Sequence, residues 1–184
     1  MKPPDDDHDL VLRFQSEGDS KCFEDLYLRH REPVYRLIAK VVLNEHAAQD
    51  LTQDTFVKAS RNIHQFNGTA RFRTWLCRIA VNSANEYLRK MINGRERLVL
   101  LGNSAETAPG PDSPRDSLFR KEKTARVTTA LQHLEPDLRT ALVLTVMEGL
   151  DPREAAEIQG CTRSTLYWRI HKARKILKEA MAYE

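Results

Sequence analysis

The 184-residue chain has few of the features that would anchor it in a membrane or cross-link it. No stretch approaches the roughly 18–20 consecutive apolar residues of a membrane helix, and the opening residues, MKPPDDDHD, lack the apolar segment of a signal peptide. Cysteine occurs at Cys22, Cys77 and Cys161, an odd number at wide spacing, which argues against a disulfide framework and favours a reducing compartment. We therefore expect a cytoplasmic protein.

The sequence also lacks the residue groups that catalysis or a cofactor would need. None of the six histidines lies near a cysteine at zinc-ligand spacing. There is no glycine-rich phosphate loop, and no serine or cysteine stands with a histidine in the context of a known nucleophile. We expect no metal site, no cofactor and no enzymatic activity.

Strand signals are weak, because alternating runs of β-branched residues are absent, whereas helical periodicity is present on both sides of a central break. The predicted fold class is therefore all-α. We predict helices over about 8–17, 20–43, 45–63 and 74–92, and about four more from 117 to the end. The break, GNSAETAPGPDSPRDS, contains three of the eight prolines and predicts a flexible linker. The expected organisation is a domain at 1–97, a linker at 98–117 and a domain at 118–184.

Charge is unevenly distributed along the chain. Residues 61–97 hold eight basic and two acidic side chains, and residues 161–184 hold six and two. The stretches before them are acidic: 1–60 has twelve acidic and eight basic side chains, and 126–160 has six and three. Two basic blocks indicate two contacts with a polyanion, and the acidic blocks indicate surfaces that avoid it.

The C-terminal residues contain the pattern of a helix-turn-helix. Asp151 and Pro152 suit a helix start, with Glu154 as the second half of a capping box, and Gly160 suits its end. Thr162 then caps a second helix, which in this motif enters the DNA major groove. On that helix Leu166, Ile170, Ala173 and Leu177 form the inner stripe. The outer face holds Ser164, Trp168, His171, Lys172 and Lys175, with Tyr167 at its margin, and is flanked by Arg163, Arg169, Arg174 and Lys178.

A second sorted helix lies in the first domain. In residues 74–90 the side chains of Arg78, Asn82, Asn85 and Arg89 share an outer stripe. Asparagine is a poor helix former, so two on one stripe favour a role such as hydrogen bonding to base edges, with the arginines holding the backbone. The preceding loop, QFNGTARFRT, and its surroundings add stacking candidates, although Phe72 and Trp75 fit a core position equally well. The stacking candidates are Phe66, Phe72 and Trp75.

An acidic and amide-rich face is predicted on the helix before that loop. Its outer arc holds Gln49, Asp50, Gln53, Asp54 and Val57. Such a face suits a basic protein partner better than DNA, because complementary charge sets orientation and encounter rate. Ordinary solvation of the helix is the alternative.

Together these segments resemble the extracytoplasmic-function (ECF) group of bacterial sigma factors. FEDLYLRHREPVYRLI resembles the start of that family's first domain, AAQDLTQDTFVKAS its polymerase-binding helix, and QFNGTARFRTWLCRIAVNSANEYLRK its −10 reader. LEPDLRTALVLTVMEGLDPREAAEIQGCTRSTLYWRIHKAR resembles its −35 reader. The resemblance implies a transcription initiation factor that binds core RNA polymerase, directs it to promoters and melts the −10 element by capturing a flipped base near Asn82. It also implies control by an anti-sigma factor, which could hold the protein at the inner membrane.

The resemblance assigns three sets of residues. The polymerase-binding set is Gln49, Asp50, Gln53, Asp54 and Val57. The −10 set is Phe66, Asn67, Gly68, Arg71, Arg73, Trp75, Arg78, Asn82, Asn85 and Arg89. The −35 set is Arg163, Ser164, Thr165, Tyr167, Trp168, Arg169, His171, Lys172 and Arg174.

The chain departs from the family pattern in several places. Gln49 stands where glutamate is usual, Ser60 where tryptophan is usual, and Ser164-Thr165-Leu166 where Gly-Thr-Val is frequent. The −35 sequence therefore does not carry over. The alternative function is that of a stand-alone helix-turn-helix regulator with an N-terminal sensor, which would bind duplex DNA tightly without polymerase.

Overall fold

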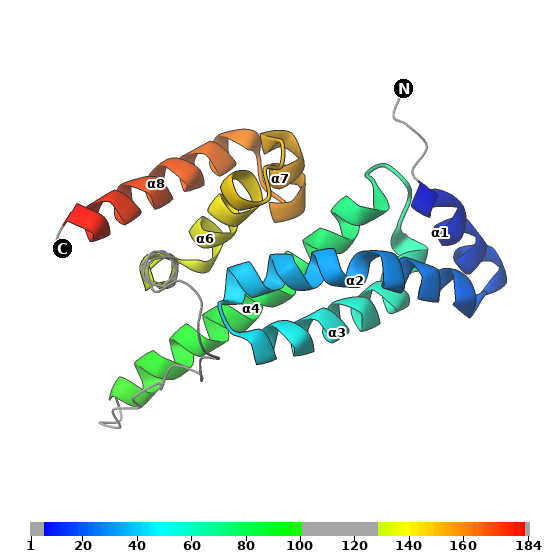
Figure 1. Cartoon of the computed structure of the whole chain (residues 1–184), viewed down its shortest axis with the longest axis horizontal. Helices are drawn as coiled ribbons and strands as arrows, with labels where there is room; N and C mark the ends of the chain where they lie inside the picture. Colours follow the sequence, from blue (N-terminus) through cyan, green and yellow to red (C-terminus); the bar gives the residue numbers. More distant parts are fainter. Residues whose placement is uncertain (1–5, 101–128, 183–184) are drawn as a thin grey trace, which may run out of the picture.

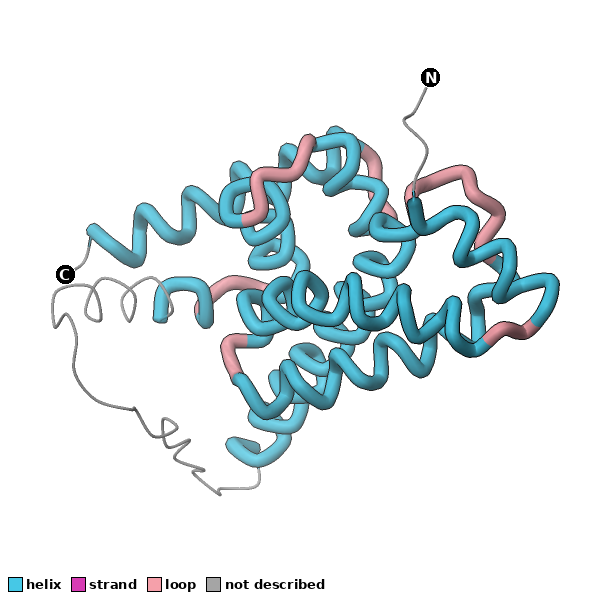
Figure 2. Tube along the Cα trace, turned by 45° about the vertical axis from the view of Figure 1, so that its right-hand side comes forward, coloured by secondary structure: helices cyan, strands magenta, loops and turns pink. Residues whose placement is uncertain are grey.

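The computed structural model describes residues 6–100 and 129–182, and the regular elements in these ranges are all helical (Figures 1 and 2). The first range contains α1 (Asp6–Glu17), α2 (Ser20–Val42), α3 (Glu45–Asn62) and α4 (Phe72–Leu100), with a 3₁₀ turn at Ile63–Gln65. The four helices predicted for this range are confirmed. The predicted helix at 74–92 is longer at both ends, and Leu98 to Leu100 continue it.

The second range begins with helical residues at 129–132, which are followed by a short α6 (Pro136–Leu142). Helix α6 continues into a π-helical turn at Val143–Met147. It is followed by α7 (Pro152–Gln159) and α8 (Arg163–Ala182), which form the predicted helix-turn-helix. The predicted all-α class is confirmed. Residues 101–117 of the predicted linker, and residues 118–128 of the predicted C-terminal domain, lie outside the described residues.

The helix ends follow from local side-chain chemistry. The Asp19 and Asn44 side chains accept hydrogen bonds from the backbone N–H groups of Lys21 and Ala47, which caps α2 and α3. Asp151 caps α7 in the same way through Arg153 N at 2.7 Å. Gly160 ends α7 with a φ of 60°, a conformation that glycine adopts without a Cβ clash.

The predicted capping box of α7 is wrong in its second half. Glu154 does not turn back toward the start of its own helix. Its carboxylate accepts a hydrogen bond of 3.2 Å from the Thr74 hydroxyl on α4, eighty positions away in the sequence. A residue assigned to local helix capping therefore serves a contact between the two halves of the chain.

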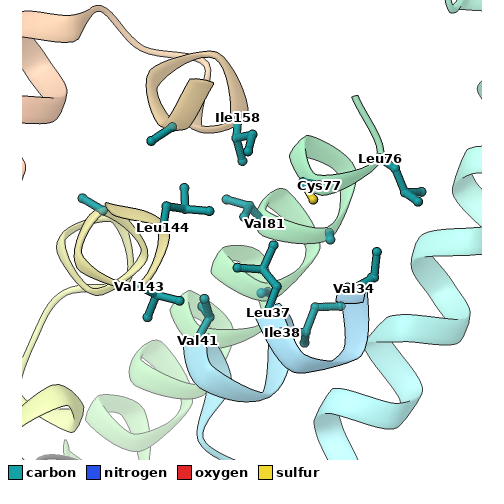
Figure 3. Packing of buried hydrophobic residues seen from close by; sticks show 14 of the residues in the cluster. Val34, Leu37, Ile38, Val41, Leu76, Cys77, Val81, Val143, Leu144 and Ile158 are labelled. Atoms are coloured by element: carbon teal, nitrogen blue, oxygen red, sulfur yellow. The ribbon is translucent and has the colours of Figure 1, made fainter. Parts of the chain in front are cut away.

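The buried residues form one continuous core across both halves. Leu26, Ile38 and Leu76 are fully buried in the N-terminal part, and Leu138 and Leu166 in the C-terminal part. Figure 3 shows the junction: side chains of α2 and α4 lie beside those of the π-helical turn and α7. The labelled residues at this junction include Leu37, Val41, Val81, Val143, Leu144 and Ile158. The C-terminal helices are thus packed onto α2 and α4 through apolar surface, the main stabilising contribution in such contacts.

Candidate nucleic-acid and polymerase interfaces

Helix α8 presents the outer face that its sequence predicts. Leu166 and Ala173 are fully buried and Ile170 is 8% exposed, whereas Tyr167 and Trp168 are 57% and 56% exposed. Two large aromatic side chains left in solvent on a helix-turn-helix are candidates for DNA contact, because burial in the protein's own core would otherwise be favourable.

The aromatic and basic side chains of α8 are also organised. The Lys172 Nζ lies 5.0 Å from the centroid of the Trp168 ring, a cation–π distance. At the helix start, the Thr162 hydroxyl accepts a hydrogen bond from Thr165 N at 3.2 Å, which confirms the predicted cap. The exposed members of the −35 set are Arg163, Ser164, Tyr167, Trp168, His171 and Arg174, with Thr165 and Lys172 half-buried.

Arg169 differs from the other members of the −35 set because it is engaged inside the protein. Its guanidinium donates to the Gln159 side chain at 2.8 Å and lies 3.3 Å from an Asp137 carboxylate oxygen. Its side chain is 18% exposed. In this conformation it is not free for a phosphate.

The polar stripe of α4 does not face solvent along its whole length, contrary to the sequence-based expectation. Asn82 is exposed, but Asn85 is only 5% exposed because α6 covers it. The Asn85 amide donates to Asp137 at 3.0 Å and accepts from the Thr140 hydroxyl at 2.8 Å. Arg89 donates to the same Asp137 oxygen at 2.7 Å. The stripe is polar, as predicted, and part of it is an internal contact surface.

The loop before α4 begins in an aromatic cluster that Phe66 forms with Phe72 and Trp75. Phe66 is 8% exposed, and its ring centroid lies 5.9 Å from that of Phe72 and 5.5 Å from that of Trp75. The expected availability of Phe66 for stacking on a base is wrong for this conformation. Trp75 is half-buried, so both of its proposed roles, core and contact, have structural support.

Helix α1 also holds this loop in place, a contact that no sequence pattern predicted. The Gln15 amide donates to the carbonyls of Ile63 and Phe66 at 2.6 and 3.0 Å. At the tip, Gly68 has a φ of 71°, and the Asn67 side chain accepts hydrogen bonds from the N–H and hydroxyl of Thr69. The remaining basic residues near the loop, Arg71 and Arg73, are exposed, as are Asn67 and Gly68.

A cavity of about 650 Å³ opens between this loop and the helix-turn-helix. One wall comes from the loop and α4 and the other from α7 and the turn that follows it. Its lining includes Asn67, Thr69, Trp75, Arg78, Glu157 and Cys161. The Arg78 guanidinium lies directly against Gly160, where a Cβ would be 3.1 Å from the nearest nitrogen.

The acidic and amide face of α3 is exposed as predicted. Gln49, Asp50, Gln53, Asp54 and Val57 all lie in solvent, while Ala48, Thr55, Phe56 and Ala59 are buried on the opposite side. A shallow groove of about 270 Å³ runs beside this face against α2. Its walls include Tyr27, Arg31, Tyr35, Gln49 and Gln53. The face is available to a partner without any rearrangement of the chain.

Two further polar contacts tie the C-terminal part to α2. The Lys40 ammonium forms an ion pair with Glu148, and the buried Arg139 guanidinium donates to the Val41 carbonyl at 2.9 Å. Burial lowers the pKa of Arg139 from its ordinary value. Burial also raises the pKa of the Cys77 thiol on α4 to about 11.

Within residues 6–100 and 129–182, no group of three or more His, Cys, Asp or Glu side chains is arranged to hold a metal ion. No helix in the same ranges is long and apolar enough to cross a membrane.

Comparison with known families assigns both halves of the chain. The Sigma-70 region 2 family matches residues 26–93, and the Sigma-70 region 4 family matches residues 124–177. The RNA polymerase sigma-H factor of Pseudomonas aeruginosa is 34% identical over 187 residues, which cover 98% of this chain and 96% of that protein. The ECF RNA polymerase sigma-E factor of Haemophilus influenzae is 34% identical over 178 residues, covering 94% and 93%.

Two solved structures share the arrangement of helices. CnrH in complex with the cytosolic domain of CnrY has a TM-score of 0.66 at 25% identity, covering 97% of this chain and 98% of that one. The sigma factor RpoE of Bartonella quintana, in complex with the anti-sigma factor NepR, has a TM-score of 0.66 at 27% identity, covering 88% and 98%.

Proposed function

Because the chain belongs to the extracytoplasmic-function group of bacterial RNA polymerase sigma factors, we propose a division of labour among α3, α4 and α8. In this proposal α3 binds core polymerase, α4 with its preceding loop reads and melts the −10 element, and α8 reads the −35 element. The protein is a transcription initiation factor, and its own residues contribute binding rather than catalysis.

The observation that carries the proposal is the separation of charge between α3 and α8. The carboxylates and amides of α3 are exposed on one part of the chain, and the aromatic and basic face of α8 is exposed on another. A polymerase surface and a DNA surface can therefore be engaged at the same time. Opposite charge character on the two faces keeps each from competing for the other's partner.

At the −10 element, Asn82 is the proposed base-reading residue. It is exposed on α4 and lies on the same stripe as Arg89 and Arg78, of which Arg78 lines the cavity beside the loop. An amide can pair with the edge of an unstacked base, while the neighbouring arginines bind the strand's phosphates. Phe66 supports the loop from the core, and Trp75 is the aromatic residue that borders the cavity.

At the −35 element, α8 would lie in the major groove with Trp168 and Lys172 toward the bases. Arg163 and Arg174 flank this face and would bind phosphates, which gives affinity without sequence information. The cation–π contact between Lys172 and Trp168 orients both side chains before DNA arrives.

Control by an anti-sigma factor is part of the proposal. The structurally similar sigma factor RpoE was solved with the anti-sigma factor NepR, and CnrH was solved with the cytosolic domain of CnrY. An anti-sigma factor with a cytosolic domain and a membrane anchor would keep this protein in the cytoplasm but at the inner membrane until a signal releases it.

The test is transcription by purified core RNA polymerase with and without the full-length protein, using sheared genomic DNA of the source organism as template. We expect a discrete set of new transcript 5′ ends that appear only when the protein is added. Tight binding to specific duplex DNA by the protein alone, with no new transcripts, would instead favour a stand-alone helix-turn-helix regulator.

A further inference from the structure

We infer that the C-terminal domain of the free protein closes over the proposed −10-reading face of α4, with the Asp137 carboxylate in the place of DNA. This inference deepens the proposed function and rests on it, because it assigns a regulation to the same face. We call Asp137, Asn85, Arg89 and Arg169 the Asp137 cluster.

Asp137 occupies a site whose donors are those of a nucleic-acid contact. One carboxylate oxygen accepts from the Asn85 amide at 3.0 Å and from the Arg89 guanidinium at 2.7 Å, and the other lies 3.3 Å from Arg169. Two guanidinium groups and an amide around one anion form the kind of site that binds a phosphate or a base acceptor. The side chain is 34% exposed, so the site lies at the edge of the closed contact.

In this conformation both ends of the Asn85 amide are engaged by α6, one through its NH₂ group and one through its oxygen. Its NH₂ group donates to Asp137, and its oxygen accepts from Thr140. Both partners belong to α6, and the side chain is 5% exposed. A strand of DNA could reach Asn85 only after α6 has moved away.

The cluster also joins the two proposed DNA readers to each other. Arg89 lies on α4 and Arg169 on α8, and Asp137 of α6 binds both. A phosphate that drew Arg169 toward the −35 duplex would remove one of the cation partners of Asp137. Engagement of DNA by α8 therefore weakens the closure over α4.

Two further polar contacts between the two parts of the chain also come from the acidic block of residues 126–160. Glu154 binds Thr74 of α4, and Glu148 binds Lys40 of α2. With Asp137 they are three of the six acidic residues in this segment. Asp137 and Glu154 contact α4 residues that lie within the basic block 61–97, which holds eight basic and two acidic side chains. The acidic segment, which its charge predicts to stay away from DNA, thus contacts the basic segment, which its charge predicts to bind DNA.

Apolar packing holds the same elements together beneath the polar ties. Val81 of α4 lies near Leu144 of the π-helical turn and Ile158 of α7 (Figure 3). Opening would expose these side chains to water, which is unfavourable. The closed form should therefore dominate in the free protein until polymerase binding holds the domains apart.

The first experiment measures DNA binding by the full-length protein without polymerase. The probe is a fluorescent pool of 15-nucleotide single-stranded DNA of random sequence, followed by anisotropy. The variant is Asp137→Asn, and the matched control is Glu135→Gln, which removes the same charge from an exposed side chain two positions away. We expect Asp137→Asn to bind about tenfold more tightly than wild type, because charge-assisted bonds are lost only from the closed form. Glu135→Gln should match wild type.

The second experiment detects opening without DNA, through the native Cys77 thiol. Cys77 is 6% exposed on the part of α4 that faces α7, and Cys22 is 2% exposed inside the N-terminal helices. Alkylation of each cysteine is followed by peptide mass spectrometry. Asp137→Asn and Arg89→Ala should both speed Cys77 labelling severalfold relative to Cys22, and Glu135→Gln should not. Arg89→Ala weakens the closure from the α4 side, so the test does not depend on how well one variant folds.

The outcomes separate the inference from the proposed function. Unchanged Cys77 labelling in both variants would overturn the closure, while polymerase-dependent transcription could still succeed. Faster Cys77 labelling with no gain in single-stranded DNA binding would show opening of a face that does not bind DNA. That result would overturn the inference together with the −10 role of α4. Faster labelling together with the expected gain in affinity supports both.

Discussion

The two helices proposed to read DNA differ in what covers them when the protein is alone. The outer face of α8 is open, with Trp168 and Tyr167 more than half exposed. On the corresponding face of α4, Arg78, Asn82 and Arg89 are exposed, although Arg89 is paired with Asp137, and α6 covers Asn85. The difference indicates an order of events in which α8 is ready for duplex DNA, whereas α4 is ready only after the domains separate.

This order has a physical reason. The −35 element is read as intact duplex, so an exposed reader risks only weak nonspecific binding through phosphates. The −10 element must be unstacked, and an exposed single-strand site would bind any free nucleic acid in the cell. Covering α4 with an acidic surface of the same chain lowers that binding without loss of the residues that perform it.

The largest expected effect concerns the partner that we expect to separate the domains. Asp50→Arg or Asp54→Arg should weaken binding to core polymerase by about 2–5 kcal/mol if the charge is buried at that interface, and by less at its rim. Both residues are exposed on α3, so the fold should be unaffected. The measurement is competition for labelled core enzyme, with the exposed Glu24→Arg on α2 as the control for net charge. Wild-type affinity in both α3 variants would remove α3 from the polymerase interface.

The second-largest expected effect tests α4, the helix that α6 partly covers. Asn82→Ala should leave core binding unchanged but reduce open-complex formation, because a base contact of this kind contributes roughly 1–3 kcal/mol. Permanganate reactivity of the −10 thymines reports opening on a duplex promoter. A promoter supplied with a single-stranded −10 region should regain only part of the activity, since the unstacking step is removed but the base contact is still missing. If the Asn82→Ala holoenzyme forms open complexes at the wild-type rate, Asn82 is only a solvated surface residue and does not contact a base.

The exposed reader should respond differently to substitution. Trp168→Ala and Lys172→Ala should change which −35 bases are preferred, at roughly 1–3 kcal/mol per lost base contact. Arg174→Ala should weaken binding to all sequences alike and lower the slope of log affinity against log salt by roughly one. A promoter library selected with each holoenzyme provides both measurements. Identical base preferences in the wild type, Trp168→Ala and Lys172→Ala would contradict the orientation proposed for α8.

Local sequence signals predicted the helices of this protein well. The predicted 20–43 and 45–63 became Ser20–Val42 and Glu45–Asn62, because the caps and apolar spacing that set these ends lie within a few residues of them. The inner stripe of α8 and the open face of α3 were predictable for the same reason. Helical periodicity decides which side chains point away from the core of their own domain.

What covers an outward face is not a local property, and here the sequence-based expectations failed. The sequence pattern of an amide on an outer helical stripe is the same whether the amide contacts water, DNA or another domain. The burial of Asn85 under α6 was therefore not predictable from the sequence. Glu154 has the right spacing for a capping box, but Thr74 lies within reach only in the folded chain. Phe66 stands in a loop sequence, yet Phe72 and Trp75 bring it into the core.

The smallest expected effect compares two glycines with the same backbone conformation. Gly160 and Gly149 have φ values of 60° and 63°, so an alanine at either position is strained by roughly 1–2 kcal/mol. A Cβ at Gly149 would meet no atom within 4 Å, whereas one at Gly160 would lie 3.1 Å from the Arg78 guanidinium of α4. Gly149→Ala and Gly160→Ala should therefore both lower the melting temperature, Gly160→Ala by the larger amount, and only Gly160→Ala should also speed Cys77 alkylation. Equal alkylation in the two variants would mean that Arg78 moves aside at no cost, and that the turn of the helix-turn-helix contributes nothing to covering α4.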